Sequence, residues 1–223
     1  QLLSIDLSKA SMESVIVPNL LGITTSNEYI GLSKNDAVLD IYKNGFNDRI
    51  FSLQSYGNSI TCSCLNSQYY IAINGTNNGK LILYSLNKGE IIRVIDLQAN
   101  PVKLIVTPGW GFIVCFAKKI LGNKTTNYLF VLSLNGEIIQ TVKIDFDVHL
   151  WHCWKSNKGF DFLAIADELG KVYGFEVFYC KVGEPLCNFE SKIMMISFIK
   201  EISCIIVVTE DTHIHFVPFN EIE

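Results

Sequence analysis

Residues 60–97 read ITCSCLNSQYYIAINGTNNGKLILYSLNKGEIIRVIDL, and this stretch decides the fold. It holds four short apolar runs, at Ile60–Leu65, Tyr69–Ile73, Leu81–Leu86 and Ile91–Leu97. Gly and Asn fill the longer breaks between the runs, and no helical periodicity is sustained. The stretch therefore predicts four consecutive short β-strands.

The same four-part order recurs along the chain. Units like the one at Ile60 begin at Val102, Val148 and Ile193, at intervals of 42, 46 and 45 residues, and a more degenerate copy begins near Val15. A fixed period changes the prediction of the whole fold, because each unit is then one supersecondary structure that stacks on the next. Four-stranded units at this spacing are typical of WD40-type β-propellers.

We therefore predict an all-β protein, a WD40-type β-propeller with about five degenerate four-stranded blades or a fragment of a seven-bladed ring. The predicted blades span residues 14–58, 59–100, 101–146, 147–191 and 192–223, as one propeller region over 1–223. Residues 1–13 are expected to form the outer strand of a preceding or closing blade. A β-sandwich is the alternative fold, although it requires no repeat.

Turn residues support strands over helices. Asn44-Gly45, Asn135-Gly136 and Lys88-Gly89 lie between apolar runs, where a tight hairpin needs positive φ. Runs such as Leu81–Tyr84 and Leu129–Leu132 are apolar on both faces, which indicates strands covered on both sides by neighbouring sheets.

Composition narrows the class of protein. The chain has 223 residues, of which 49% are hydrophobic and only 18% charged, so a large core is expected. The formal net charge of -4 argues against a phosphate-binding surface, and therefore against nucleic acid as a partner. No apolar stretch approaches a membrane span, and the first residues lack a signal-peptide pattern. Seven scattered cysteines predict reduced thiols and a cytoplasmic protein.

The sequence offers few candidates for catalysis or metal binding. His149, His152 and Cys153 lack the paired spacing of a zinc site, and His213 with His215 is more typical of a half-buried polar stripe on a strand. The sequence also lacks a P-loop and a nucleophile placed beside a base. We expect no enzyme activity, no cofactor and no metal.

Candidate binding residues lie in predicted loops. Loops that join second to third strands, and loops that join one blade to the next, share one rim of a propeller. We expect six acids on this rim to gather into an acidic arc suited to a basic peptide: Asp145, Asp147, Asp167, Glu168, Glu210 and Asp211. Solvated turn acids are the alternative interpretation. The stretch 118–127 is expected to be the longest loop of the rim, with three lysines opposing the arc.

Trp110 is a further candidate for partner binding. It lies between Gly109 and Gly111 and is expected to expose one face, because Trp is enriched at interface hot spots. Trp151 and Trp154 are expected to pack between blades, and packing is also the alternative interpretation for Trp110.

Several motifs carry a family resemblance. They are TPGWGF at 107–112, LSLNGE at 132–137, the span Trp151–Trp154, GFD at 159–161 and ADELGK at 166–171. Together they resemble the C-terminal WD-repeat propeller of BEACH-domain (beige/neurobeachin-type) proteins, particularly divergent members from single-celled eukaryotes. The units depart from the WD40 pattern, because none carries Gly-His and the Trp-Asp positions hold other pairs, such as Tyr84-Ser85.

The resemblance implies a protein-interaction platform within a large scaffold that acts in vesicle trafficking or membrane dynamics. Its expected partners are other proteins, bound through the loop rim, and the BEACH and PH-like domains of the same parent chain. Neither nucleic acid nor direct membrane insertion is expected, and the resemblance implies a cytoplasmic protein that is peripheral at intracellular membranes through its parent chain. A propeller subunit of another multiprotein assembly, such as a coat or regulatory complex, is the alternative. A third alternative is a propeller enzyme or small-ligand binder, which requires polar side chains on innermost strands that here read mostly apolar.

Overall fold

The computed structural model describes residues 2–6, 11–15, 18–46 and 48–219. These residues form β-strands and one short 3-10 turn, η1 (Lys200–Ile202), with no α-helix among them. The prediction of an all-β protein is therefore confirmed. Within the described ranges, no helix is long and apolar enough to cross a membrane.

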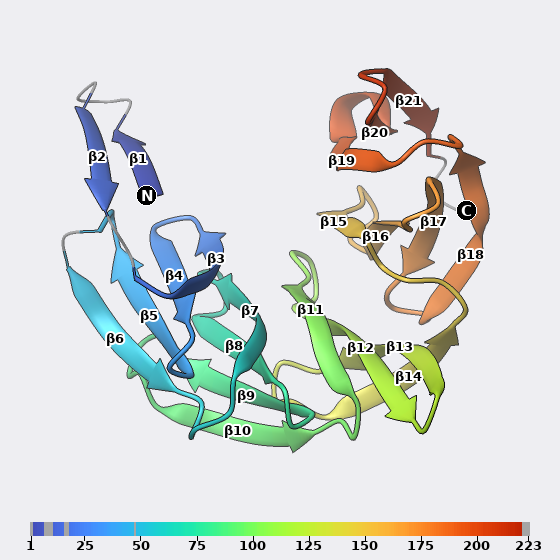
Figure 1. Ribbon diagram of the computed structural model, residues 1–223. Helices are drawn as coiled ribbons and strands as arrows, with labels where there is room; N and C mark the ends of the chain where they lie inside the picture. The colour runs from blue at the N-terminus through green and yellow to red at the C-terminus, as the bar shows by residue number, and fades with distance from the viewer. Residues whose placement is uncertain (1, 7–10, 16–17, 47, 220–223) are drawn as a thin grey trace. The chain divides into compact units, whose positions relative to one another are not determined.

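The strands form a series of antiparallel sheets, most of them four-stranded (Figure 1). The first has the order β3–β4–β5–β6: Leu20–Ser26, Tyr29–Lys34, Val38–Lys43 and Arg49–Gln54. The second has the order β7–β8–β9–β10: Ile60–Asn66, Ile71–Thr76, Lys80–Ser85 and Ile91–Asp96. The repeat of four-stranded units predicted from residues 60–97 is confirmed.

The remaining sheets continue the pattern. The third has the order β11–β12–β13–β14: Asn100–Val106, Ile113–Leu121, Lys124–Leu132 and Ile138–Ile144. The fourth has the order β15–β16–β17–β18: Leu150–Lys155, Asp161–Ala166, Lys171–Glu176 and Lys181–Asn188. The fifth has three described strands, β19–β20–β21: Ile193–Ile199, Cys204–Thr209 and Ile214–Pro218.

The chain divides into two compact units, residues 1–104 and 105–223, which are described separately. In the first unit, Leu39 and Ile41 of β5 pack with Ala72 of β8 and Ile82 of β9 in a core between two sheets. Buried Asp40 ties together three strands of one sheet, because Lys34, Ser52 and Arg49 all donate to its carboxylate. These two sheets of the first unit thus cover one another, as both-face apolar strands require.

The second unit has two cores. In one, Val114 of β12 and Leu129 of β13 pack with Leu163 and Phe175 of the fourth sheet. In the other, Trp154 stacks on Phe198 of β19 with ring centroids 4.2 Å apart. Trp154 is buried, which confirms the expectation of packing between sheets for that residue.

The predicted hairpin turns have the expected backbone. Asn44 and Gly45 both have positive φ, of 53° and 117°, and Gly89 and Gly136 also have positive φ. Asn and Gly adopt positive φ at the least cost, so Asn44-Gly45 has the residue types that the connection from β5 to β6 needs.

The prediction of a long loop over 118–127 is wrong. Strands β12 and β13 run through this stretch and pair up to Leu121 and Lys124, so that only Gly122 and Asn123 form the turn. Hairpin pairing satisfies the backbone hydrogen bonds that a ten-residue loop would leave to water.

The N-terminal segment forms a hairpin. Strands β1 (Leu2–Asp6) and β2 (Ser11–Val15) pair only with each other among the described strands. The expectation that residues 1–13 supply the outer strand of a preceding or closing blade stays a prediction.

Candidate interaction site

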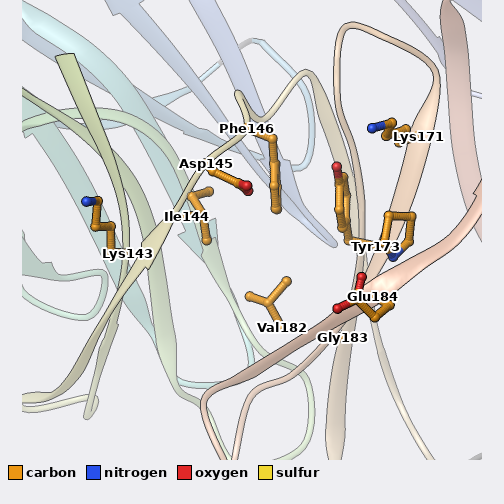
Figure 2. Close-up of a pocket in the computed structure, with 10 residues that line it drawn as sticks. Lys143, Ile144, Asp145, Phe146, Lys171, Tyr173, Val182, Gly183 and Glu184 are labelled. Carbon is orange, nitrogen blue, oxygen red and sulfur yellow. The ribbon is translucent and has the colours of Figure 1, made fainter. Parts of the chain in front are cut away.

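An acidic groove lies between the third and fourth sheets, within the second unit. We use this name for two adjoining cavities of about 490 and 290 Å³. They share four lining residues, which are Asp145, Phe146, Lys171 and Tyr173. Asp145 and Phe146 follow β14, whereas Lys171 and Tyr173 belong to β17. The groove is therefore built by strands of two neighbouring sheets (Figure 2).

Two aromatic rings form a wall of the groove. Phe146 and Tyr173 stack in parallel, with ring centroids 3.9 Å apart and planes 5° apart (Figure 2). Tyr173 is buried and Phe146 half-buried, so the stack fixes the connection after β14 against β17. The pair gives the groove a rigid apolar surface beside its carboxylates.

Asp167 lines the smaller of the two cavities and also stabilises the turn between β16 and β17. Its carboxylate accepts hydrogen bonds from the backbone N–H of Leu169 at 2.9 Å and of Lys171 at 2.8 Å. The Tyr173 hydroxyl donates to the same carboxylate at 3.4 Å. Asp167 is only 3% exposed, so it is a turn-forming residue and not a solvated acid.

The rim of the groove is held by a side-chain network. Asn127 donates from Nδ2 to the carbonyl of Phe146 at 2.8 Å and to Oδ1 of Asp147 at 3.0 Å. Lys118 pairs with the same oxygen of Asp147 at 2.8 Å. A lysine of the stretch 118–127 was expected to oppose the acids of the arc. Lys118 does so at Asp147, although it lies on a paired strand and not in a loop.

Negative charge dominates the groove. Its lining includes five acids, Asp145, Asp147, Asp167, Glu168 and Glu184, against the two lysines Lys143 and Lys171. Burial raises the pKa of Tyr173, and the neighbouring charges of Asp167, Asp145 and Glu184 raise it further. The phenol of Tyr173 therefore stays protonated. The carboxylates that line the groove offer acceptor oxygens to a cation.

The structure brings together four of the six predicted acids. Asp145, Asp147, Asp167 and Glu168 line one cavity. Glu210 and Asp211 lie in the β20–β21 turn, outside the lining of both cavities. Asp211 pairs there with Nδ1 of His213 at 2.9 Å.

Trp110 is placed at the opposite end of the strands. It lies in the β11–β12 turn and is 56% exposed, as expected from its glycine neighbours. Buried Asp161, at the start of β16, accepts hydrogen bonds from the Thr107 hydroxyl at 2.7 Å and from the backbone N–H groups of Gly109 at 2.7 Å and Trp110 at 2.8 Å. Asp167 follows the other end of β16, so Trp110 and the acidic groove lie at different ends of the same sheet.

The cysteines and histidines are the remaining candidate nucleophiles and metal ligands. All seven cysteines carry thiols, and burial raises the pKa of Cys62 to about 12 and that of Cys187 to about 11. His215 lies against Phe189, with ring centroids 4.3 Å apart. In the part of the chain that the structure describes, no three His, Cys, Asp or Glu side chains are arranged to hold a metal.

Sequence reasoning missed several residues of these surfaces. Phe146, Tyr173 and Asp161 read as ordinary strand or turn positions, because their partners are distant in the sequence. Phe178 and Tyr179 were missed as well, and both lie exposed in the turn between β17 and β18.

Comparisons with known proteins identify the fold and no family. No family model matches the chain, and no curated protein matches it. Among solved structures, the crystal structure of the computationally designed Ika8 protein is similar, with a TM-score of 0.69 and 12% sequence identity. The match covers 90% of this chain and 58% of the designed protein, so this chain spans little more than half of that protein's length. The fold is all-β, with repeated antiparallel four-stranded sheets consistent with a β-propeller-like architecture.

Proposed function

We propose that this chain is a protein-interaction platform whose acidic groove binds a basic segment of a partner protein. The groove carries the proposal, because it joins a rigid aromatic wall to an excess of carboxylates. Asp145 and Glu168 are exposed at its mouth, while Phe146 and Tyr173 form its wall. Lys or Arg side chains fit such a groove, since their stems pack on aromatic rings while their charged ends meet acceptor oxygens.

The sequence resemblance supports a proposal about the larger protein in which this platform acts. We propose that the platform belongs to a BEACH-type scaffold of vesicle trafficking or membrane dynamics, with the motifs at 107–112, 159–161 and 166–171 as its support. Affinity purification of the parent protein from its own cells tests this setting. A BEACH domain in the parent chain and bound trafficking proteins are the expected result, and a parent chain without that domain would refute it.

Charge reversal in the groove tests the binding mode. Asp145→Lys combined with Glu168→Lys changes two exposed acids and leaves the turn-forming Asp167 intact. We expect a fluorescent Lys/Arg-rich peptide to bind the variant at least about tenfold more weakly than the wild type, in about 0.15 M salt. Fluorescence anisotropy titration measures the difference.

The fifth sheet offers a matched control. Glu210→Lys combined with Asp211→Lys makes the same change in net charge outside the groove. Glu210 and Asp211 line neither cavity, so this control is expected to bind like the wild type. Equal weakening by both double variants would mean that net charge alone attracts the peptide, and the groove proposal would then fail.

A further inference from the structure

Four aromatic side chains form a partly exposed cluster at the end of the sheets that carries Trp110. We call Trp110, Phe160, Phe178 and Tyr179 the aromatic cluster. Trp110 and Phe178 have ring centroids 5.8 Å apart, Phe178 and Tyr179 5.2 Å, and Phe160 and Phe178 5.9 Å. Trp110, Phe178 and Tyr179 are 56%, 45% and 63% exposed. Three separate turns thus present one contiguous aromatic surface.

Trp110 is fixed in place and needs no further hydrogen bond. The Asp161 carboxylate holds the backbone N–H of Trp110, and the indole Nε1–H donates to the carbonyl of Gly159 at 2.8 Å. An apolar partner can therefore cover the indole without leaving a buried donor unpaired. A side chain ordered before binding also loses little conformational entropy when a partner covers it.

Two lysines are the exposed charges in the segment that leads to Phe160. Lys155 and Lys158 are exposed in the segment that leads to Gly159 and Phe160. Asp161 directly follows Phe160 in the chain, but it is buried. Donors of the β11–β12 turn already occupy its carboxylate oxygens. Glu176 of β17 lies opposite Lys181 of β18, and both flank the turn that carries Phe178 and Tyr179. The two exposed lysines are therefore available to a negatively charged partner.

We propose that the aromatic cluster is a second docking surface, which binds a partner segment with apolar side chains flanked by Asp or Glu. The apolar side chains would cover Trp110, Phe178 and Tyr179, and the carboxylates would meet Lys155 and Lys158. This surface goes beyond the proposed groove. It lies at the opposite end of the fourth sheet and prefers the opposite charge.

The orientation of the indole favours a protein segment over a lipid surface. At a membrane interface, Trp places its ring in the apolar region and its N–H toward the wet headgroups. The N–H of Trp110 instead turns inward, to the carbonyl of Gly159. The exposed part of the ring is thus the part that an apolar protein side chain covers.

Peptide selection with defined variants tests the proposal. A phage library of random peptides is selected on the wild-type chain and, in parallel, on Trp110→Ala. We expect peptides that need Trp110 to contain Leu, Phe or Trp flanked by Asp or Glu. Their synthetic forms are expected to bind Trp110→Ala, and separately Lys155→Glu combined with Lys158→Glu, at least about tenfold more weakly than the wild type.

Controls separate this surface from the groove and from a loss of folding. Tyr56→Ala removes another exposed aromatic side chain, of 69% exposure, and is expected to leave binding unchanged. The same holds for the groove variant Asp145→Lys combined with Glu168→Lys, so the two proposals can fail independently. Tyr179→Ser serves as a second cluster variant if thermal melting shows that Trp110→Ala does not fold.

Three outcomes would overturn the proposal. They are the absence of any peptide that depends on the cluster, a preference for basic peptides, and equal binding when Asp and Glu of the peptide are replaced by Asn and Gln. Vesicles of phosphatidylcholine and phosphatidylserine are tested beside the peptides. If vesicles bind in a Trp110-dependent manner and no peptide does, the surface is a lipid-binding one and the proposal is wrong.

Discussion

Asp161 connects the start of β16 to the β11–β12 turn through a single buried carboxylate. Its two oxygens accept from the hydroxyl of Thr107 and from two backbone N–H groups, those of Gly109 and Trp110. Hydrogen bonds to a charged acceptor are stronger than neutral ones, and a buried donor left unpaired costs additional free energy. This carboxylate therefore determines the conformation of the β11–β12 turn.

Asp161→Asn is expected to weaken this connection. The amide keeps the volume of the carboxylate but replaces one acceptor oxygen with a donor, so at least one N–H or hydroxyl loses its partner. We expect the free energy of unfolding to fall by about 1–3 kcal/mol. Urea denaturation followed by tryptophan fluorescence measures the change, and Asp145→Asn, an exposed acid in the same unit, is the control. An unchanged unfolding curve would show that this carboxylate contributes nothing to stability.

At the residue scale, sequence predicts exposure better than it predicts partners. Trp110 was expected to be exposed because Gly109 and Gly111 flank it, and it is. The role of Asp161 could not be predicted, because its partners Thr107 and Trp110 lie 54 and 51 residues away. Contacts between neighbouring sheets depend on the register of both sheets, which no local pattern specifies.

At the scale of elements, the turn between β16 and β17 depends both on its own backbone conformation and on a contact with a distant segment. Gly170, between β16 and β17, has a φ of 85°, which disfavours any residue with a side chain. Its carbonyl also accepts the backbone N–H of Phe189, just after β18, at 3.0 Å. A Cβ at Gly170 would overlap the carbonyl oxygen of Ser191. This turn thus packs against the connection that leaves the sheet.

Gly170→Ala is expected to destabilise the chain more than Gly57→Ala does. Gly57 also has positive φ, of 78°, but a Cβ there would meet nothing within 4 Å. The backbone penalty of about 1–2 kcal/mol applies to both, so the difference between them isolates the overlap with Ser191. Thermal melting of both variants provides the comparison. Equal melting temperatures would show that the Ser191 carbonyl moves aside without cost.

The stretch 118–127 departed from the sequence expectation for an identifiable reason. The turn Gly122-Asn123 is a hairpin signal, but the polar residues around it read as a loop, and the exposed Ile120 and Leu121 obscured the alternation. Strand β18 contains Gly183 and Pro185, both of which weaken a strand signal. Its pairing with β17 is irregular near Pro185, and it is an outer strand, where proline is tolerated.

For the whole molecule, the repeat predicted the sheets but only part of the acidic site. The period of the apolar runs gives the number and order of strands, because every unit buries the same positions. It also placed Asp145, Asp147, Asp167 and Glu168 together, since loops in equivalent positions of neighbouring sheets adjoin. The aromatic wall was not predictable, because Phe146 and Tyr173 stack across two sheets.

Backbone hydrogen exchange should follow strand position within each sheet. The second strands β8 and β16 are buried along their whole length and pair on both sides, so their amides are expected to exchange most slowly. The outer strand β10 pairs on one side and is mostly exposed, so its amides are expected to exchange faster. Exchange measured by mass spectrometry on short peptides resolves these strands. Uniform protection across a sheet would contradict this prediction.

Hydrogen exchange in strand β21 also tests whether the fifth sheet has a further strand. It is third in its sheet, as β9 and β17 are in theirs, but among the described strands it pairs only with β20. Ile214 and Phe216 of β21 are 61% and 59% exposed, whereas most of β9 and half of β17 are buried. With one partner strand, β21 should exchange like outer strand β10. If it is instead as protected as β9 and β17, another strand pairs with its free edge in solution.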